Sequence, residues 1–221
     1  MEPIITIIPV KNFESSKLRL AHLFSEAERK NLSYFMLMDV INALKEIQYI
    51  IKIVITTPME DIPGLSNCLN KKIKILCDPI NDLNGAIAEA INFCKYNHFN
   101  NSMFLIMPSD IPMVRSTDII DLINNKLNSE AQITLVPSNR NDGTNSILFD
   151  SSIKLKTYFG PNSFDKHKKI YEKKYKISVF NSYRIGFDVD YEEDLKILYN
   201  YIQVENTFTL KYLKTLNIFN K

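Results

Sequence analysis

The stretch NDGTNSILFD at residues 141–150 marks the place where the pattern of the chain changes. Before it, short β-branched runs alternate with helical patterns, which is typical of a largely parallel sheet with helices between the strands. The run SILFD at 146–150 instead follows a polar turn directly, so we expect partly antiparallel pairing there. The sequence therefore predicts a mixed α/β sheet, with a polar turn placed at the mouth of one strand.

The predicted elements alternate along the whole chain. Strands are expected at 4–10, 50–57, 72–78, 102–110, 132–138, 146–150 and 177–180. Helices are expected from a capping box at Ser25 and Glu28 to about residue 47, and at 84–97, 116–128, 191–202 and about 205–217. A Lys-rich amphipathic segment precedes the last strand. The chain has 221 residues, 45% of them hydrophobic, and no repeat or obvious linker, so we predict a single α/β domain over residues 1–221.

The charge balance and the apolar runs exclude two classes of partner. Lys and Arg number 27 against 25 for Asp and Glu, so the net charge of +2 indicates neither nucleic acid nor an anionic membrane. The apolar runs fall short of the ~20 residues that span a bilayer. We find no signal-peptide pattern. We therefore expect a cytoplasmic protein.

The thiol and imidazole groups show no pattern of a site. The cysteines are odd in number and lack C-x-x-C spacing, which supports neither a disulfide framework nor a thiolate zinc site: Cys68, Cys77 and Cys94. The histidines show no ligand spacing, and no Ser-His-acid pattern suggests covalent hydrolysis: His22, His98 and His167. These observations favour a reducing compartment and chemistry without zinc.

Polar segments follow several predicted strands. In open α/β sheets ligands bind outside the carboxyl ends of the strands, where the connections diverge. The segments at these positions are PVKNFESSKLRL at 9–20, DPINDLNGA at 78–86, PSDIP at 108–112 and NDGTN at 141–145. Their placement predicts one shared cleft.

A basic loop after the first strand carries Lys11, Lys17 and Arg19. Their spacing would let several cations converge on one polyanion, although a solvated basic loop is the plain alternative. The loop lacks G-x-x-x-x-G-K-[ST] and G-x-G-x-x-G, so neither a P-loop ATPase nor a dinucleotide fingerprint is indicated. Phosphate binding here would use side chains more than a glycine nest.

Three carboxylates follow strand ends. Asp110 ends an apolar strand, where a turn or N-cap role is the alternative. Asp188 and Asp190 alternate with apolar residues in GFDVD, so extended backbone points both to one face. Asp190 also makes a plausible helix-cap pair with Glu193. Together the three would suit a hard, oxygen-ligated cation such as Mg²⁺.

A second small-residue cluster is FGPNSFDKH at 159–167. Gly160, Pro161 and Asn162 form a predicted turn, and Ser163 opens a helix, where backbone amides and a hydroxyl hold an anion well. The alternative is a plain turn with a serine cap. The lysines that follow read as a solvated face, because no aromatic platform accompanies them.

The order of these motifs resembles the 2-phospho-L-lactate guanylyltransferase family of coenzyme F-420 biosynthesis. The motifs are IIPVKNFESSKLRL, NDLNGA, SDIP, NDGTNSILF, FGPNSFDKH and GFDVDYEEDL, spread over nearly the whole chain. The resemblance implies a nucleotide-diphospho-sugar transferase fold of the glycosyltransferase-A type: a mostly parallel mixed sheet flanked by helices. It also implies transfer of GMP from GTP to the phosphate of 2-phospho-L-lactate, which gives lactyl-2-diphospho-5'-guanosine and pyrophosphate with Mg²⁺ as cofactor.

The same resemblance assigns roles to particular residues. Metal ligands would be Asp110, Asp188 and Asp190, although Asp190 is shorter than the Glu of some relatives. Catalysis would rest on Lys11, Lys17, Arg19 and Asp110. The nucleotide would contact Pro9, Val10, Lys11, Lys17, Asn84, Gly85 and Ser109, with Gly85 standing where another small residue is expected. The acceptor would contact Thr144, Gly160 and Ser163. The polar turn before residue 146 would then serve to bind the acceptor.

Several alternatives stay open at this level. The acceptor could instead be phosphoenolpyruvate or 3-phosphoglycerate, which differ by a bond, a hydroxyl or the phosphate position. A sugar-1-phosphate nucleotidyltransferase or glycosyltransferase fits the motif order less well. A non-catalytic nucleotide sensor or scaffold would keep the basic loop without needing three acidic positions. The motifs do not explain a preference for guanine, and none of them decides between a monomer and a homodimer.

Overall fold

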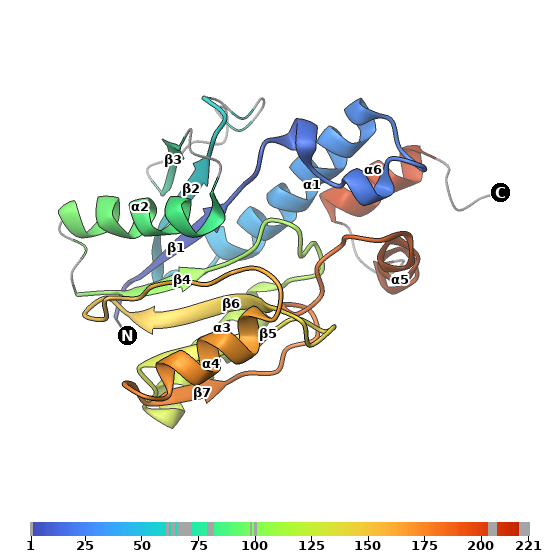
Figure 1. The fold of residues 1–221 in the computed structure, drawn as a ribbon. Coiled ribbons are helices and arrows are strands. Elements are labelled where there is room, and N and C mark those ends of the chain that lie inside the picture. The colour runs from blue at the N-terminus through green and yellow to red at the C-terminus, as the bar shows by residue number, and fades with distance from the viewer. Residues whose placement is uncertain are drawn as a thin grey trace.

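The described residues form one seven-stranded sheet with the strand order β3-β2-β1-β4-β6-β5-β7 (Figure 1). The computed structural model describes residues 2–60, 62, 65, 72–78, 82–97, 99, 101–202 and 207–216. The strands are β1 Ile4–Pro9, β2 Ile50–Thr57, β3 Ile73–Cys77, β4 Met103–Ile106, β5 Ile133–Pro137, β6 Thr144–Asp150 and β7 Ile177–Val179. Every predicted strand is present: β2 has the expected bounds, β1, β3, β5 and β7 are a residue or two shorter, and β6 starts two residues earlier, at Thr144. The run at 102–110 is shortened most, because β4 ends at Ile106 ahead of Pro108, which lacks the N–H that a ladder needs.

Strand pairing changes from parallel to antiparallel at β6. Strand β1 pairs in parallel with β2 and β4, and β2 pairs in parallel with β3. Strand β6 is antiparallel to both β4 and β5, and the turn at 138–143 joins β5 to β6 as a hairpin. Strand β7 then returns parallel to β5. The mixed pairing predicted from NDGTNSILFD is therefore confirmed.

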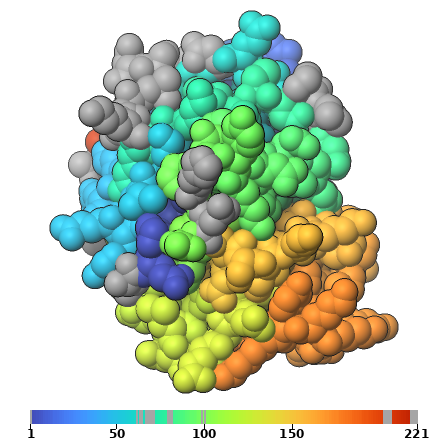
Figure 2. All heavy atoms as spheres, turned by 90° about the vertical axis from the view of Figure 1, so that its left-hand side faces the viewer, coloured from blue at the N-terminus to red at the C-terminus, as the bar shows by residue number. Residues whose placement is uncertain are grey.

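Helices cover both faces of the sheet. They are α1 Glu26–Lys45, α2 Leu83–Tyr96, α3 Ser116–Ser129, α4 Ser163–Tyr171, α5 Glu192–Ile202 and α6 Phe208–Thr215. Successive residues of β1 point to opposite faces, so Ile4 and Ile8 pack under α1 and α3, whereas Ile5 and Ile7 pack under α2 and α4. In Figure 2 the green segment, which contains α2, lies above the orange segment, which contains α4, on the same side of the molecule.

Helix α1 starts where its capping box predicts. The Ser25 hydroxyl accepts from the N–H of Glu28 at 3.4 Å, and the Glu28 carboxylate accepts from the N–H of Ser25 at 2.7 Å. The two bonds satisfy donors that a helix start leaves open. The helix ends at Lys45, slightly before the expected residue 47. The predicted C-terminal helices are present as α5 and α6, although residues 205, 206 and 217 of the second prediction lie outside the described residues, as do Cys68, His98 and residues 79–81.

A third apolar cluster fixes the loop after β1. Helix α6 packs on α1, and α5 packs on α6. Leu198 of α5 and Leu210 of α6 belong to this cluster, which also holds Leu20 and Phe24 from the loop. Leu20 is fully buried and Phe13 nearly so, which anchors the loop on both sides of Lys17. Burying a side chain of this size contributes roughly 1.5–3 kcal/mol. These anchoring residues and Lys17 are therefore packed into the fold, whereas Lys11 and Arg19 are exposed, as the solvated alternative expects.

Candidate active site

The loops at the carboxyl ends of β1 and β4 and the β5–β6 hairpin surround a cavity of about 560 Å³. Most of the predicted site residues line it: Pro9, Val10, Lys11, Lys17, Arg19, Ser109, Asp110, Thr144, Gly160, Ser163, Asp188 and Asp190. Both Asn84 and Gly85 are described, and neither lines this cavity. The single cleft predicted from the segments after the strands is thus present.

Asn84 supports the cavity wall from outside. Its side-chain amide donates to the carbonyl of Phe159 at 3.1 Å and accepts from the N–H of Phe159 at 2.8 Å. These two bonds hold the residue that precedes Gly160. Gly85 lies in the first turn of α2, where its N–H donates to the Asp82 carboxylate at 2.9 Å. Their predicted contact with the nucleotide stays a prediction.

Lys17 joins two of the predicted metal ligands. Its ammonium donates to Asp110 at 2.6 Å and to Asp190 at 3.0 Å, and only 6% of its side chain is exposed. Burial opposes the charge, but the two carboxylates outweigh it and raise the pKa of Lys17. Its backbone has φ of 51°, a left-handed conformation that disfavours non-glycine residues by roughly 1–2 kcal/mol. The loop accepts this strain while the lysine reaches both carboxylates.

The cap alternatives for the acidic and hydroxyl residues are wrong. Asp194 accepts from the N–H groups of Asp190 and Tyr191, at 2.8 and 2.7 Å, and so takes the place predicted for Glu193. The Asp190 carboxylate accepts from Lys17 and Arg19 instead of a helix N–H. Asp110 binds Lys17, and the next helix begins only at residue 116. Ser163 is the first residue of α4, and its hydroxyl accepts from the N–H of Thr144 on β6 instead of capping the helix.

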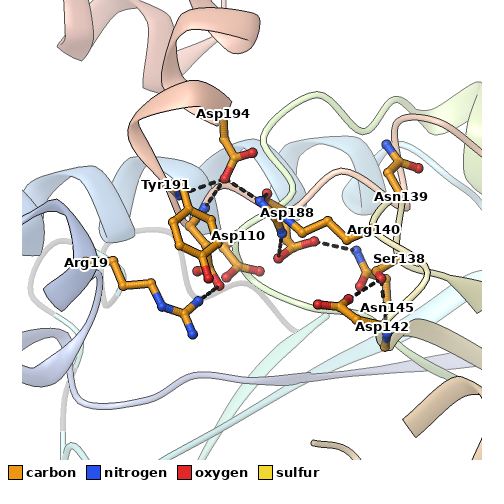
Figure 3. Close-up of polar contacts among 12 residues, drawn as sticks. Arg19, Asp110, Ser138, Asn139, Arg140, Asp142, Asn145, Asp188, Tyr191 and Asp194 are labelled. Carbon is orange, nitrogen blue, oxygen red and sulfur yellow. Dashed lines mark hydrogen bonds and ion pairs between the residues drawn. The ribbon is translucent and has the colours of Figure 1, made fainter. Parts of the chain in front are cut away.

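Arg140 is a site residue absent from the sequence prediction. It lies in the hairpin turn, and its guanidinium donates to Asp188 at 2.9 Å and to Asp194 (Figure 3). Burial opposes its charge, yet Asp188 and Asp194 hold the pKa of Arg140 above its ordinary value. In the sequence, Arg140 stands out only as a cation directly before the NDG turn. Its partner Asp188 lies 48 residues further along the chain, so local sequence could not reveal the pair.

Tyr191 contacts two of the cations. The guanidinium carbons of Arg19 and Arg140 lie 4.7 and 5.1 Å from the centre of its ring (Figure 3). Arg19 also donates to Asp190 at 2.9 Å. Cation–π contacts of this kind contribute about 0.5–1 kcal/mol at exposed sites. The ring therefore helps to place both arginines at the cavity edge.

The carboxylates could supply some, but not all, of the oxygen ligands of a cation. Burial, and then the nearby charge of Asp110, raise the pKa of Asp188, which indicates crowded negative charge between them. The pKa of Asp190 is lowered, because Lys17 and Arg19 outweigh its burial. Among the described residues no three Asp, Glu, His or Cys side chains form a ready cage for a metal ion. Mg²⁺ usually takes one or two carboxylates and completes its shell with phosphate and water, so the donor set fits that ion.

The start of β6 and the start of α4 present hydroxyl groups and open backbone to the cavity. The N–H of Thr144 donates to the Ser163 hydroxyl at 2.9 Å, which ties the start of β6 to the start of α4. Gly160 has φ of +142°, and no atom lies within 4 Å of the place where a Cβ would stand. Its backbone needs glycine for conformational reasons. This part of the cavity could receive a small anion between the hairpin and α4.

Solved structures first define the class of fold. A protein from Desulfovibrio desulfuricans G20 assigned as a nucleotide-diphospho-sugar transferase superimposes with a TM-score of 0.75, at 15% identity over 97% of this chain and 95% of the other. A cytidylyltransferase from Leptospira borgpetersenii gives a TM-score of 0.59 at 16% identity over 100% and 94%. The fold is that of the nucleotide-diphospho-sugar transferases, as the resemblance implied.

The family follows from the sequence comparisons. Residues 4–221 match the family described as "Guanylyl transferase CofC like". The chain is 31% identical to the 2-phospho-L-lactate guanylyltransferase of Methanosphaera stadtmanae over 99% of its length and 92% of the relative's. It is 34% identical to the enzyme of the same name from Methanobrevibacter smithii, again over 99% and 92%. The chain belongs to the CofC-like guanylyl transferase family.

The helices give one further result on membranes. Across the described part of the chain, none is both long enough and apolar enough to cross a bilayer.

Proposed function

We propose that this protein is an enzyme that transfers GMP from GTP to the phosphate of 2-phospho-L-lactate. The products would be lactyl-2-diphospho-5'-guanosine and pyrophosphate, a step of coenzyme F-420 biosynthesis. One observation carries the proposal: in this chain, which belongs to the family, three kinds of group line one cavity. They are the cations of the basic loop, the carboxylates Asp110, Asp188 and Asp190, and the hydroxyl residues Thr144 and Ser163. The names of its relatives support the acceptor.

Charge is the main obstacle to this reaction. A phosphate monoester has a second pKa of ~6, so the acceptor is mostly a dianion near neutrality and needs no general base. Two unit charges 4 Å apart repel by about 4 kcal/mol at an effective dielectric of ~20, and several such pairs meet during attack. The residues of the site must therefore neutralise charge.

The basic loop would bind the triphosphate. Lys17 and Arg19 now hold the carboxylates Asp110 and Asp190, and the phosphates of GTP would compete for these cations. Together with Lys11 they would offset charge on the β- and γ-phosphates, which leave as pyrophosphate. Lys11 lines the same cavity.

Asp110 and Asp188 would hold Mg²⁺, with Asp190 beside them. When bound, the ion would supply positive charge to phosphate oxygens. Asn145 donates to Asp188 at 3.3 Å and to the carbonyl of Ile185 at 3.1 Å, so it orients that carboxylate. Thr144, Gly160 and Ser163 would position the acceptor opposite the nucleotide, and fixed positioning is itself a large part of catalysis in phosphoryl transfer.

The proposal is tested by pyrophosphate release. Purified protein with Mg²⁺ and GTP is mixed with 2-phospho-L-lactate, phosphoenolpyruvate or 3-phosphoglycerate in separate reactions, with ATP as the nucleotide control. Release that needs both GTP and 2-phospho-L-lactate is expected. Release with one of the other acceptors alone would keep the reaction class and replace the acceptor. GTP binding without release in any mixture would favour a nucleotide sensor.

A further inference from the structure

His167 is a buried imidazole whose two ring nitrogens both have partners. It lies on α4 with none of its surface exposed. Its Nδ1 is 2.9 Å from the hydroxyl of Thr144, and its Nε2 accepts from the backbone N–H of Tyr158 at 2.8 Å. The Thr144 hydroxyl thus connects this histidine to a residue that lines the cavity.

The contact with Tyr158 decides where the imidazole proton lies. A backbone N–H can only donate, so Nε2 must present its lone pair. A neutral imidazole then carries its proton on Nδ1 and donates it to the Thr144 hydroxyl oxygen. The rings of Tyr158, Phe159 and Tyr171 surround His167 at 5.2–6.0 Å, and burial, with the charge of Lys166, lowers the pKa of His167 to about 4. The ring is therefore neutral near pH 7.

The fixed tautomer determines what the cavity presents. The Thr144 oxygen accepts from His167, and the Ser163 oxygen accepts from the N–H of Thr144. Each hydroxyl has one proton left, and among the described residues neither proton has an acceptor in the protein. Both residues line the cavity, so we expect this part of it to offer two hydroxyl donors. Such a pair favours an anionic oxygen.

We propose that His167 is a positioning residue that fixes the Thr144 hydroxyl as a donor toward an anionic oxygen of the acceptor. The inference deepens the proposed function, on which it rests, because it concerns the part of the same cavity that would hold the acceptor. It assigns the histidine no contact with the reacting atoms. Its effect should therefore be found in the binding of the acceptor and not in that of GTP.

Two variants separate the two contacts of the ring. In His167→Asn the amide stands near the place of Nδ1 and can still donate to Thr144. In His167→Gln the longer amide reaches the place of Nε2 and can accept from Tyr158, while the donor to Thr144 is lost. Both variants shrink the side chain, so each controls for lost packing in the other.

We expect His167→Gln to raise the KM of the acceptor about 10-fold, as loss of a hydrogen bond that orders a binding group predicts, with the KM of GTP unchanged. His167→Asn should stay nearer the parent. On a Thr144→Val background, where no hydroxyl remains to orient, adding His167→Gln should raise the acceptor KM no further. Equal effects of Asn and Gln, or additive effects with Thr144→Val, would show that His167 only fills space.

The tautomer itself is measured without turnover. Nitrogen-15 NMR of the parent protein at neutral pH should show a protonated Nδ1 and an unprotonated Nε2 for the resonance that disappears in His167→Gln. A proton on Nε2, or a charged ring, would overturn the proposal even in an active enzyme. If the parent protein releases no pyrophosphate with any acceptor, the proposed function fails, and the NMR result still decides the hydrogen-bond arrangement.

Discussion

Lys17 shows how the site balances charge at the level of single residues. One ammonium binds two carboxylates, and Arg140 pairs with a third. Each of these ion pairs occupies a group that the proposed reaction needs, since the cations would bind phosphate and the carboxylates would bind metal. Substrate binding must therefore exchange partners within the cavity, and the free energy of each exchange depends on both groups.

Asp110→Asn tests the carboxylate with the shortest contact to Lys17. The substitution keeps the shape of the side chain and removes its charge, so both the hold on the metal and the placement of Lys17 should weaken. We expect turnover to fall at least ~100-fold, which corresponds to ~2.7 kcal/mol in the transition state. Asp121→Asn, at an exposed position on α3, is the matched control. Near-normal turnover at saturating Mg²⁺ would remove Asp110 from the mechanism.

Ser163→Ala tests the hydroxyl at the start of α4, in the same cavity lining. It removes one proposed donor to the acceptor and leaves the N–H of Thr144 without its partner. We expect the KM of the acceptor to rise roughly 10-fold with little change for GTP, and the protein to lose about 1–3 kcal/mol of stability for the unpaired buried donor. Steady-state kinetics and chemical denaturation measure the two effects, with Ser152→Ala as an exposed control. A defect confined to GTP would reassign the residue.

At the level of elements, α6 is fixed by a carboxylate of another helix. Asp39 on α1 accepts from the N–H groups of Phe208 and Thr209, at 2.7 and 2.9 Å, and so satisfies donors at the start of α6. Burial raises the pKa of Asp39 to about 6, although these donors and Lys211 pull it down. Helix α6 packs on α1. The stability of this contact therefore depends on pH.

The sign of that dependence follows from the raised pKa. The folded state binds the Asp39 proton more tightly than the unfolded state, so this contribution to stability is present at low pH and is lost as pH rises through about 6. The Asp39→Asn variant has no carboxyl to ionise at this position, so its stability should not fall in this way. Comparing unfolding free energies at about pH 4.5 and 7.5, we expect the parent to lose about 2 kcal/mol relative to the variant.

Asp165→Asn, at an exposed position on α4, should change with pH as the parent does. If Asp39→Asn also follows the parent at both pH values, the carboxylate titrates outside this range and α6 is held in another way.

Elements were predictable from sequence where one local pattern decides them. The Ser25 capping box located the start of α1, and the turn before residue 146 indicated the antiparallel strand. Element ends were less accurate: β4 ends at Ile106, ahead of Pro108, whereas the apolar run suggested a longer strand. The caps at Asp190 and Ser163 were mistaken for a different reason: a side chain that could serve its own helix found a stronger partner from a distant segment.

At the scale of the whole molecule, the cavity draws on segments from both halves of the chain. Loops after β1 and β4 provide cations and carboxylates, and the hairpin, the start of α4 and residues 188–191 complete the wall. Sequence reasoning located most of these residues because they follow strands. It missed Arg140 and the role of His167, whose partners are defined only after the sheet and α4 come together.

Ligand binding should stabilise the whole fold, because one nucleotide would contact segments that are distant in sequence. GTP with Mg²⁺ at 100 times its Kd should raise the unfolding free energy by ~2.7 kcal/mol, and the Tm by roughly 5–10 °C for a chain of this size. Thermal unfolding with ATP at the same concentration is the control. Equal shifts with ATP and GTP would mean that the cavity recognises the triphosphate and not the base.

Replacing Tyr191 by tryptophan would give the protein a fluorescent probe in the cavity wall. The chain contains no tryptophan and 11 tyrosines, so Tyr191→Trp would introduce a single indole whose emission can be excited apart from all of them. That indole would stand against the two guanidinium groups that now contact the tyrosine ring. When Arg19 turns to the phosphates of a nucleotide, the surroundings of the fluorophore change. The protein would then report the occupancy of its own cavity in real time, without any product being formed.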